Sequence, residues 1–461
     1  MTAPSPGARR AAAAPRLLRF TGDVVALAKE ERRALFDRST SSDAALRDRT
    51  RTIIERVRRD GDDALRALAV ELDGVTVDDL EIPRARWEEA LDRLPADLRR
   101  ALERAAANIE AVHRAFLPET METSPEPGIV IGRRADPLGS VGVYAPGGRA
   151  AYPSSVLMGA VPARVAGVGA VILCSPPNTP SGVPSDVVLA AAALARVDRV
   201  FAVGGAGAIA AMAYGTRTIP RVDRVIGPGN AYVAEAKLQV AGAVGIDAPA
   251  GPSELLVLAD SAADPDVIAR ELLGQAEHDP LACALAVVFP APGEPAEDVR
   301  KAALALEGAI DTLVGTQDRR AIIVESLSTR GGVLRAADRA EAVAFANAYA
   351  PEHLIVAAAE ADAVLAEVRN AGTVFVGATS SNAFGDYMTG ANHVLPTGGL
   401  ARSYSGLSVL DFLRWTTYQR VSADAAARLA GDVATIAVAE GLPGHAAAAL
   451  QWRHAQGRAS A

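Results

Sequence analysis

The feature that most constrains the fold is a repeated alternation of short apolar runs with longer, alanine-rich stretches, which extends from about residue 139 to 376. The runs include SVGVYA, AVILCS and ELLVLAD, and the stretches between them have the length and composition of helices. Strands that alternate with helices in this way predict parallel βαβ units. Because the runs are almost wholly apolar, helices are expected on both faces of each sheet. The sequence therefore predicts an α/β protein with two Rossmann-like parallel-sheet domains, flanked by helical N-terminal and C-terminal segments.

Three stretches need a separate interpretation. Residues 41–117 carry apolar side chains three and four apart among dense charges, which predicts helices. The apolar run AIIVES at 321–326 is predicted to be a strand. Residues 378–408 are rich in Gly, Asn and Ser and show no sustained period, which indicates a long loop of the kind that often carries function.

The composition excludes several classes of partner. A net charge of −8 and a pI of about 5.5 argue against nucleic acid and against anionic membranes, because both attract clustered Lys and Arg. No apolar stretch has the length of a spanning helix. Cys174 and Cys283 both lie in apolar runs, so we expect two buried free thiols. These properties predict a cytoplasmic protein that binds small molecules.

The six histidines fall into two groups. His113, in a charged helix, and His454, in the tail, are expected at the surface. Each of the others has a carboxylate or amide nearby in the sequence, and these are His278, His353, His393 and His445.

The segment GQAEHDP at 274–280 raises the question of a metal site. Gln275 and His278 are three residues apart, so both side chains can face one spot at a helix end. Nitrogen and oxygen donors suit zinc or a harder ion, and Asp386 and His393 of the long loop are possible partners. The alternative is a polar helix end without a ligand.

Glu352 and His353 form a second candidate. Neighbours on a strand point to opposite faces, so both can serve one pocket only where the strand begins, and Pro351 marks such a start. A carboxylate beside an imidazole offers two bases of different strength, which suits two distinct proton transfers. The alternative is a solvated pair at the edge of a strand.

Glycine-rich turns follow three of the predicted strands, at 139–148, 203–211 and 226–232. In the second turn Gly205, Gly207 and Ala210 have G-x-G-x-x-A spacing, in which backbone amides at a helix start can hold a pyrophosphate. Three such turns at one end of a sheet favour a nucleotide-sized ligand there.

Taken together, the motifs resemble the histidinol dehydrogenase family over roughly residues 40 to 450. The resemblance rests on several segments in one order: GSVGVYAPGGRAAYPSSVLM, IGPGNAYVAEAK, APAGPSELLVLAD, LLGQAEHDP, YAPEHL, NAGTVFVG, SNAFGDYMTGANHVLPTGGLAR and EGLPGH. It implies oxidation of L-histidinol to L-histidine, the last two steps of histidine biosynthesis, with two NAD molecules and a bound Zn²⁺.

The resemblance also implies a role for particular residues. It makes Glu352 and His353 the catalytic pair. The implied zinc ligands are Gln275, His278, Asp386 and His445. Further substrate contacts are implied for Ser253, His393 and Glu440, in addition to His353 and the ligands. The positions that correspond to NAD contacts are Tyr144, Gly207 and Asn230, although the family usually has Gln where this chain has Gly207.

The resemblance further implies a homodimer in which the C-terminal segment crosses to the partner and completes its site. The expected organisation is a flexible tail and helical segment (1–40), the helical part of the first α/β domain (41–136), an α/β NAD-binding domain (137–252), an α/β domain with the metal and catalytic residues (253–400) and a helical C-terminal segment swapped to the partner (401–461).

Three other functions are compatible with some of these motifs. A sister oxidoreductase acting on another small alcohol would not need Glu440 and His445. A zinc hydrolase, in which Glu352 activates a metal-bound water, would leave the glycine-rich turns and Asn230 without a purpose. A binding protein without catalysis would not need so many polar groups between residues 352 and 393. Production of reduced nicotinamide separates the last two from an oxidoreductase.

Overall fold

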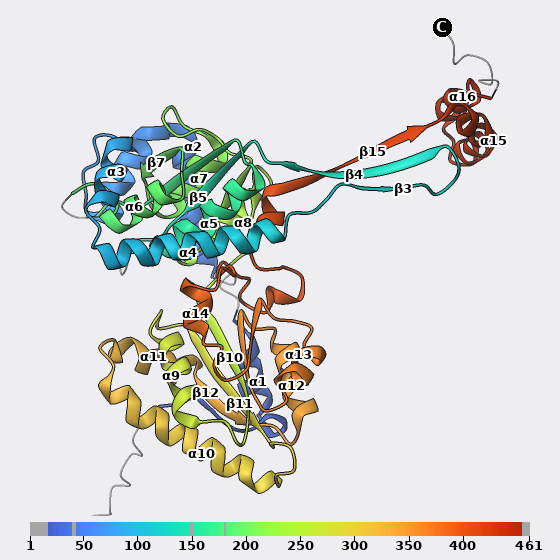
Figure 1. Cartoon of the computed structure of the whole chain (residues 1–461). Helices are drawn as coiled ribbons and strands as arrows, with labels where there is room; N and C mark the ends of the chain where they lie inside the picture. Colours follow the sequence, from blue (N-terminus) through green and yellow to red (C-terminus); the bar gives the residue numbers. More distant parts are fainter. Residues whose placement is uncertain (1–16, 39–42, 148–150, 179–180, 454–461) are drawn as a thin grey trace, which may run out of the picture.

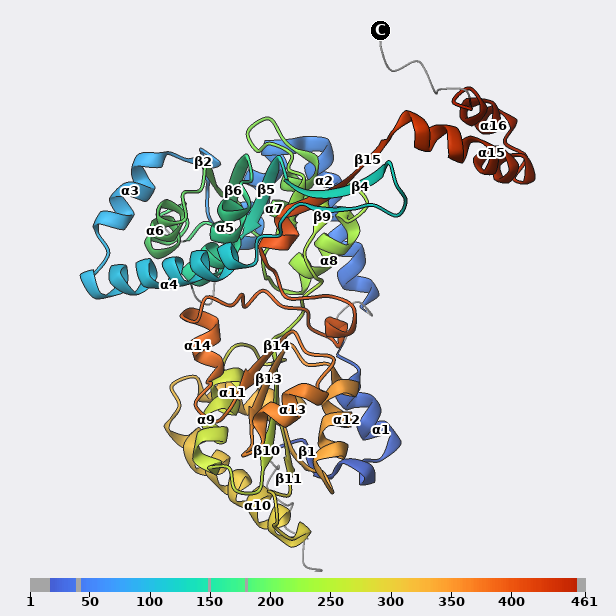
Figure 2. The ribbon, with the colours of Figure 1, turned by 45° about the vertical axis from the view of Figure 1, so that its right-hand side comes forward.

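The computed structural model describes residues 17–38, 43–147, 151–178 and 181–453 (Figure 1). Two sheet domains lie one above the other, and a slender arm extends from the upper one (Figures 1 and 2). Each domain contains a six-stranded sheet whose pairs are parallel, with one exception at an edge. The predicted fold class is therefore confirmed. Among the described residues, no helix combines the length and the apolar character needed to cross a membrane.

The upper domain is built on a sheet in the order β2-β7-β6-β5-β8-β9. Only β2 and β7 pair antiparallel. The chain winds outward from β5 in both directions, so the order reverses between β5 and β8, where open α/β sheets commonly bind ligands. The strands are β2 (Glu81–Ile82), β5 (Ser140–Tyr144), β6 (Ala170–Ser175), β7 (Arg199–Ala202), β8 (Arg224–Ile226) and β9 (Gly245–Ile246).

Helices cover both faces of the upper sheet, as its apolar strands require. One layer contains α2 (Ala44–Leu68), α7 (Gly205–Tyr214) and α8 (Ala231–Val240). The other contains α3 (Arg84–Asp92), α4 (Ala96–Ala115), α5 (Pro153–Ala166) and α6 (Asp186–Leu194). Local sequence sets the helix ends: Asn230 caps α8 by accepting the N–H groups of Tyr232 and Val233, and Pro153 occupies the first turn of α5.

The lower domain has a wholly parallel sheet in the order β1-β12-β11-β10-β13-β14. Its strands are β1 (Phe20–Asp23), β10 (Glu254–Asp260), β11 (Cys283–Phe289), β12 (Gly332–Arg335), β13 (His353–Ala357) and β14 (Thr373–Val376). One core lies between this sheet and α9 (Pro265–Ala276), α10 (Ala296–Leu313) and α11 (Arg320–Arg330). A second core lies under α1 (Lys29–Phe36), α12 (Arg339–Tyr349) and α13 (Ala361–Glu367). Cys174 and Cys283 are buried free thiols, as predicted.

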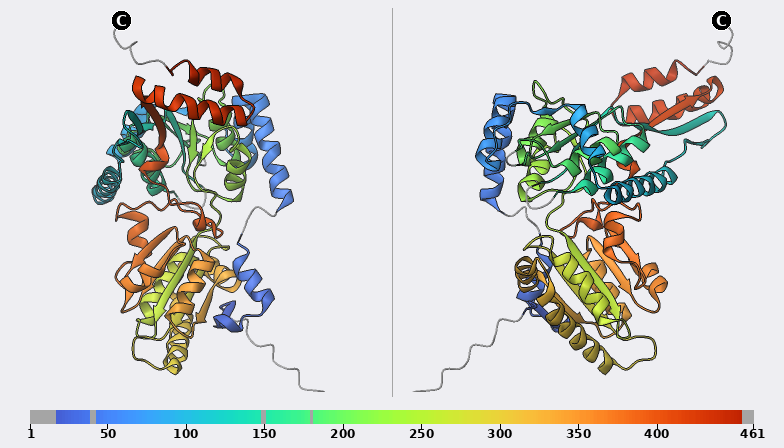
Figure 3. Two further views of the ribbon diagram at one scale, coloured as in Figure 1. Left: turned by 90° about the vertical axis from the view of Figure 1, so that its right-hand side faces the viewer. Right: turned by 60° about the vertical axis from the view of Figure 1, so that its left-hand side comes forward.

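The arm is a three-stranded antiparallel ribbon with two helices at its tip (Figures 1 and 3). Its strands are β3 (Met121–Thr123), β4 (Ile129–Pro137) and β15 (Leu413–Val421), and its helices are α15 (Ala423–Ala439) and α16 (Pro443–Leu450). β4 and β15 pair along all their residues, from Ile129 opposite Val421 to Pro137 opposite Leu413. The tip helices pack on each other through small residues and stand away from both sheets.

Several local predictions were wrong. Residues 321–326 lie within helix α11 and are not a strand. The loop at 378–408 contains a short helix, α14 (Asn382–Tyr387). The C-terminal segment, predicted to be helical, contains strand β15 before its helices. His113 is buried instead of exposed, with 2% of its surface accessible, whereas His454 lies outside the described residues.

Candidate active site

The predicted catalytic pair lies at the beginning of β13, on the side of the lower domain that faces the upper one (Figure 2). Pro351 precedes the strand, as the sequence predicted, and both Glu352 and His353 are buried. The adjoining loop passes very close, because a Cβ at Gly372 would lie 2.5 Å from the carbonyl oxygen of Glu352. Only glycine fits at that position without a shift of the main chain.

His353 has its two ring nitrogens in different environments. Nδ1 lies 3.1 Å from the carbonyl oxygen of Glu254, so in the matching tautomer its N–H donates there. Nε2 is buried and has no hydrogen-bond partner among the described residues, and it lies 3.6 Å from Oδ1 of Asp386. Burial opposes protonation, but Glu352 and Asp386 outweigh burial and raise the pKa of His353 to about 10. The main chain thus holds the imidazole through Nδ1 and leaves Nε2 for a substrate or ligand.

The main chain of Glu254 also orients Glu352. Its Oε2 accepts a hydrogen bond of 2.7 Å from the main-chain N–H of Glu254 and lies 3.4 Å from Nδ1 of His353. Ser253, the other predicted residue in this segment, directly precedes β10, and its carbonyl oxygen accepts the N–H of Cys283. The beginnings of β10 and β13 therefore place Ser253, Glu352 and His353 together.

Asp386 and His393 come from the segment after β14. Asp386 lies on α14, and its main-chain oxygen accepts the Nδ1–H of His393 at 2.9 Å. Burial acts to raise the pKa of Asp386, but hydrogen bonding and charge from His353, together with His393 and His278, lower it. The Asp386 carboxylate thus lies beside His353, and His393 is tied to its main chain.

Gln275 and His278 lie at the end of α9. Gln275 is buried in the last turn, and the N–H of His278 donates to the carbonyl oxygen of Gln275 at 3.3 Å. The amide of Gln275 meets the amide of Asn382, one turn before Asp386 on α14. Three of the four predicted metal ligands are therefore brought to one place, by α9 and α14.

The amide contact provides a test of whether these residues fit a cation. With Nδ2 of Asn382 donating to Oε1 of Gln275 at 3.2 Å, the buried Nε2 of Gln275 and Oδ1 of Asn382 have no partners among the residues that the structure describes. Turning both amides over keeps one hydrogen bond between them and moves the oxygen of Gln275 to the unpaired position. A buried carbonyl oxygen without a donor is costly, and a cation would satisfy it. The donor set fits a metal ion in that arrangement, although no cluster of three or more His, Cys, Asp or Glu arranged for an ion occurs in the described part of the chain.

The remaining predicted site residues, Glu440 and His445, are not near the others in the same chain. Both are exposed at the tip of the arm: Glu440 directly follows α15, and His445 lies in the first turn of α16. Figures 1 and 2 show this tip far from α9, α14 and β13. Within one chain, the site therefore lacks the fourth predicted ligand.

The predicted cofactor residues lie in the upper domain, at the carboxyl edge of its sheet. Tyr144 ends β5, and its hydroxyl accepts the N–H of Gly205 at 3.0 Å. The turn before α8 touches the same strand end, since a Cβ at Gly227 would lie 2.1 Å from the carbonyl oxygen of Tyr144. Asn230 is exposed there, with its side-chain oxygen engaged in capping α8. Tyr144, Gly205 and Asn230 thus surround the point where the strand order reverses.

Gly207 has a packing role in this structure. A Cβ at this position would lie 3.3 Å from Cδ1 of Leu68 and 3.4 Å from Cδ2 of Leu65, both on α2. The direction in which a side chain would leave α7 is therefore toward α2. The close packing of these helices gives a physical reason for glycine here.

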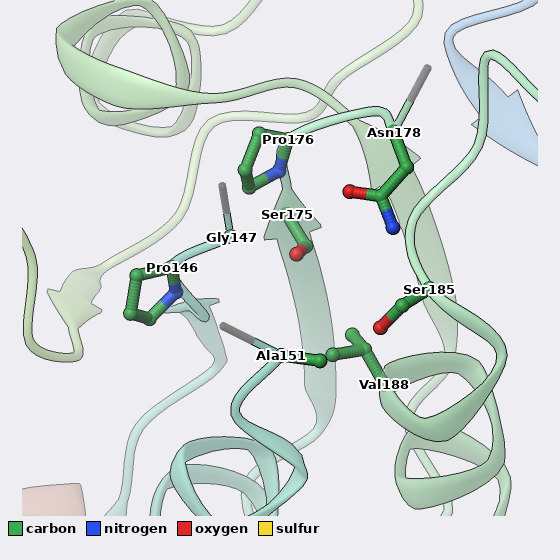
Figure 4. A pocket seen from close by; sticks show the side chains of 8 residues that line it. All are labelled: Pro146, Gly147, Ala151, Ser175, Pro176, Asn178, Ser185 and Val188. Carbon is green, nitrogen blue, oxygen red and sulfur yellow. The ribbon is translucent and has the colours of Figure 1, made fainter. Parts of the chain in front are cut away.

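A small hollow of about 110 Å³ opens beside this edge, between the ends of β5 and β6 and the start of α6 (Figure 4). Three polar side chains face it across apolar neighbours (Figure 4). Its lining consists of Pro146, Gly147, Ala151, Ser175, Pro176, Asn178, Ser185 and Val188. It has room for one ring or sugar of a larger ligand that lies along the edge.

Comparison with known proteins shows the family of the chain. The family model for histidinol dehydrogenase matches residues 36–453. The chain belongs to the histidinol dehydrogenase family. Among its relatives, the histidinol dehydrogenase of Halobacterium salinarum is 48% identical over 92% of this chain and 97% of its own length. That of Methanothermobacter thermautotrophicus is 46% identical over 86% and 90%, respectively.

A crystal structure of histidinol dehydrogenase from Elizabethkingia anophelis superposes with a TM-score of 0.87 at 31% identity. The match covers 95% of this chain and 98% of that one, so the arm is part of the shared architecture. The resemblance seen in the sequence is confirmed, and so is the predicted enzyme class, an oxidoreductase.

Sequence reasoning missed three polar residues at the site: Arg38, Glu254 and Asn382. Glu254 is the first residue of β10 and a charge directly before an apolar run, and that contrast was a usable signal. Asn382 lies four residues before Asp386, which places both on one face of a helix once α14 is recognised. Nothing in the sequence near Arg38 indicates that it is buried beside Glu254.

Proposed function

We propose that this protein oxidises L-histidinol to L-histidine through L-histidinal, transferring two hydrides to two NAD molecules with Zn²⁺ bound at the site. These are the last two steps of histidine biosynthesis. The observation that carries the proposal is the convergence of Glu352 and His353 with Asp386, Gln275 and His278 in a chain of this family.

In the first oxidation, a proton leaves the substrate hydroxyl as a hydride leaves its carbon. In its neutral form, His353 is suited to accept that proton, because Nδ1 is tied to the main chain and Nε2 has no hydrogen-bond partner among the described residues. Glu352 and Asp386 raise the pKa of this ring, and a cation held by Asp386 would offset one of these two charges and favour the neutral form. The product is an aldehyde, and NAD carries away the hydride. Ser253 and His393, beside the pair, would hold the substrate.

In the second oxidation, water adds to the aldehyde, and the hydrate loses a second hydride to a second NAD. Glu352 is suited to accept the proton of that water, because only Oε2 of its carboxylate is engaged by the main chain of Glu254. The two side chains are adjacent, with Oε2 of Glu352 3.4 Å from Nδ1 of His353, and would serve two proton transfers from oxygens on one carbon.

Gln275, His278 and Asp386 would hold the metal, with His445 of a second copy as the fourth ligand. A Zn²⁺ ion held by these residues would supply Lewis-acid polarisation and a fixed point for orienting the substrate. Glu440, on the same tip as His445, would contact the substrate from that second copy.

NAD would lie along the carboxyl edge of the upper sheet, in contact with Tyr144 and Asn230. The reversal of strand order and the N-terminus of α7 at Gly205 favour a dinucleotide at this edge. The hollow in Figure 4 would take one end of it. Gly207 has no side chain, so the contact that Gln usually makes from this position would be missing. We therefore expect weaker or altered NAD binding. Ordinary affinity in a cofactor titration would remove this part of the proposal.

The apolar surface at the tip of the arm supports the proposal of a homodimer. The tip helices expose large apolar side chains, including Val433, Ile436 and Val438. Such a surface is unfavourable in water unless another chain covers it. A second copy that receives the arm would cover these residues and gain His445.

The deciding experiment measures NADH formed per L-histidinol consumed by zinc-loaded protein, with and without a chelator. We expect two equivalents, and we expect the activity to be lost on chelation. One equivalent would indicate an alcohol dehydrogenase for a related substrate, and none would return a hydrolase to consideration.

A further inference from the structure

Residue 254 touches both members of the catalytic pair through its main chain. Its N–H donates to Oε2 of Glu352 at 2.7 Å, and its carbonyl oxygen lies 3.1 Å from Nδ1 of His353. These contacts arise because β10 and β13 are parallel neighbours, with Leu255 opposite His353. A shift of residue 254 would therefore turn both bases at once.

The side chain of Glu254 is held from two other segments. It forms an ion pair with Arg38, which precedes the upper domain, and its Oε1 accepts the N–H of Gly398 at 2.8 Å. Arg38 in turn donates to the carbonyl oxygen of Tyr349 and lies over the Tyr349 ring, 3.5 Å from its centroid. Both charged side chains are 2% exposed.

This pair has no evident value as a source of stability. Burial raises the pKa of Glu254 to about 7, while Arg38 and the N–H of Gly398 act to lower it. Buried ion pairs can often be replaced by apolar residues without loss of stability, although removal of one partner is strongly destabilising. A buried pair directly behind two catalytic side chains calls for another explanation.

We propose that Arg38 and Glu254 form a positioning unit for the catalytic pair. Arg38 and Gly398 fix the carboxylate, the carboxylate fixes the main chain of residue 254, and that main chain orients Glu352 and His353. The carbonyl oxygen of Glu254 selects the His353 tautomer that protonates Nδ1 and leaves Nε2 to accept a proton. The inference rests on the proposed function, in which His353 is a base.

The test compares Arg38→Met, Glu254→Gln and the double variant. Each single change leaves one buried group without its partner, so both stability and kcat should fall. In the double variant no charge is unpaired, and Gln can still accept the N–H of Gly398, so stability in urea should recover. We expect kcat to stay at least about tenfold below wild type, with the KM for L-histidinol within about twofold.

Recovery of kcat together with stability in the double variant would overturn the inference, because it would show a merely structural pair. Arg199→Met with Glu81→Gln is a control with the same substitutions at a half-exposed ion pair, which ties β7 to β2 away from the site. Its kcat should equal wild type. His353→Asn tells the two proposals apart: wild-type kcat in that variant would remove His353 as a base, whereas a slow His353→Asn beside a fast double variant would remove only the positioning role.

Discussion

Glu352 and His353 are adjacent in sequence but are held differently, and this difference leads to a prediction at the scale of single residues. Nε2 of His353 has no hydrogen-bond partner in the described part of the chain, whereas Oε2 of Glu352 accepts the N–H of Glu254. We expect His353→Asn to slow oxidation of L-histidinol by about 10²-fold or more, the usual contribution of a general base. Glu352→Gln should chiefly slow oxidation of L-histidinal. The measurement is the rate of NADH formation with each substrate supplied separately.

Glu352→Gln keeps the shape of the side chain, and its amide oxygen can still accept the N–H of Glu254. The change therefore removes the base and little else. Similar losses in both half-reactions for both variants would contradict the division of labour. Unchanged NAD affinity in both variants would show that the effects arise at the substrate site.

The residues that sequence reasoning found and missed at this site differ in one physical respect. Gln275 with His278, and Glu352 with His353, are close in the chain, so local spacing reveals them. Arg38 pairs with Glu254 across 216 positions, and no local pattern records such a contact. The meeting of α9 with α14 is likewise tertiary, which is why the sequence could name Asp386 as a possible partner but not show convergence.

At the scale of elements, apolar strands buried on both faces were predictable, whereas two other kinds of element were not. The run at 321–326 is apolar enough for a strand, but over the longer window of α11 the buried residues Ile323, Ser326 and Leu327 have helical spacing. β4 carries adjacent arginines and is paired with a strand almost 300 residues later, so its partner is invisible locally. The first error came from too short a window, and the second from a tertiary pairing that no local pattern records.

His113 provides a prediction about how α4 is joined to the segment before β15. Its Nδ1 accepts the N–H of Val409 at 3.2 Å, which requires a neutral ring, and burial lowers its pKa from 6.5 to about 4. A depressed pKa means that the stabilisation is complete above pH 6.5 and is lost as the pH falls toward 4. The loss should reach up to about 3 kcal/mol. Urea unfolding at several pH values between 7 and 4 measures it.

His113→Asn is the control for this pH dependence. Asn keeps an acceptor near the position of Nδ1 but does not titrate, so its stability should fall less steeply over the same range. All other groups titrate alike in the two proteins, and the difference between the curves isolates His113. Parallel curves would show that this ring does not couple α4 to Val409 as described.

At the scale of the whole molecule, the arm is the feature that one chain cannot explain. A ribbon of nine paired residues holds two helices away from the body, with apolar side chains exposed and with Glu440 and His445 at its tip. The two sheet domains carry three of the four predicted metal ligands, and the fourth, His445, is on the arm. If two copies exchanged their arms about one twofold axis, each would cover the apolar side chains of the other's tip and would gain a fourth ligand from it.

Mixed subunits test this exchange directly. His278→Ala and His445→Ala should each be nearly inactive alone. If each site takes His278 from one chain and His445 from its partner, a mixed dimer has one site with both changes and one site with neither. Co-refolding equal amounts should therefore restore activity to about a quarter of wild type, since about half of the dimers are mixed and each has one intact site. If each chain instead supplied its own His445, every site would carry one change and mixing would restore nothing.

Mixing His278→Ala with Asp386→Ala is the matched control. Both residues belong to the part of the chain outside the arm, so every site in a mixed dimer carries one change and no intact site can form.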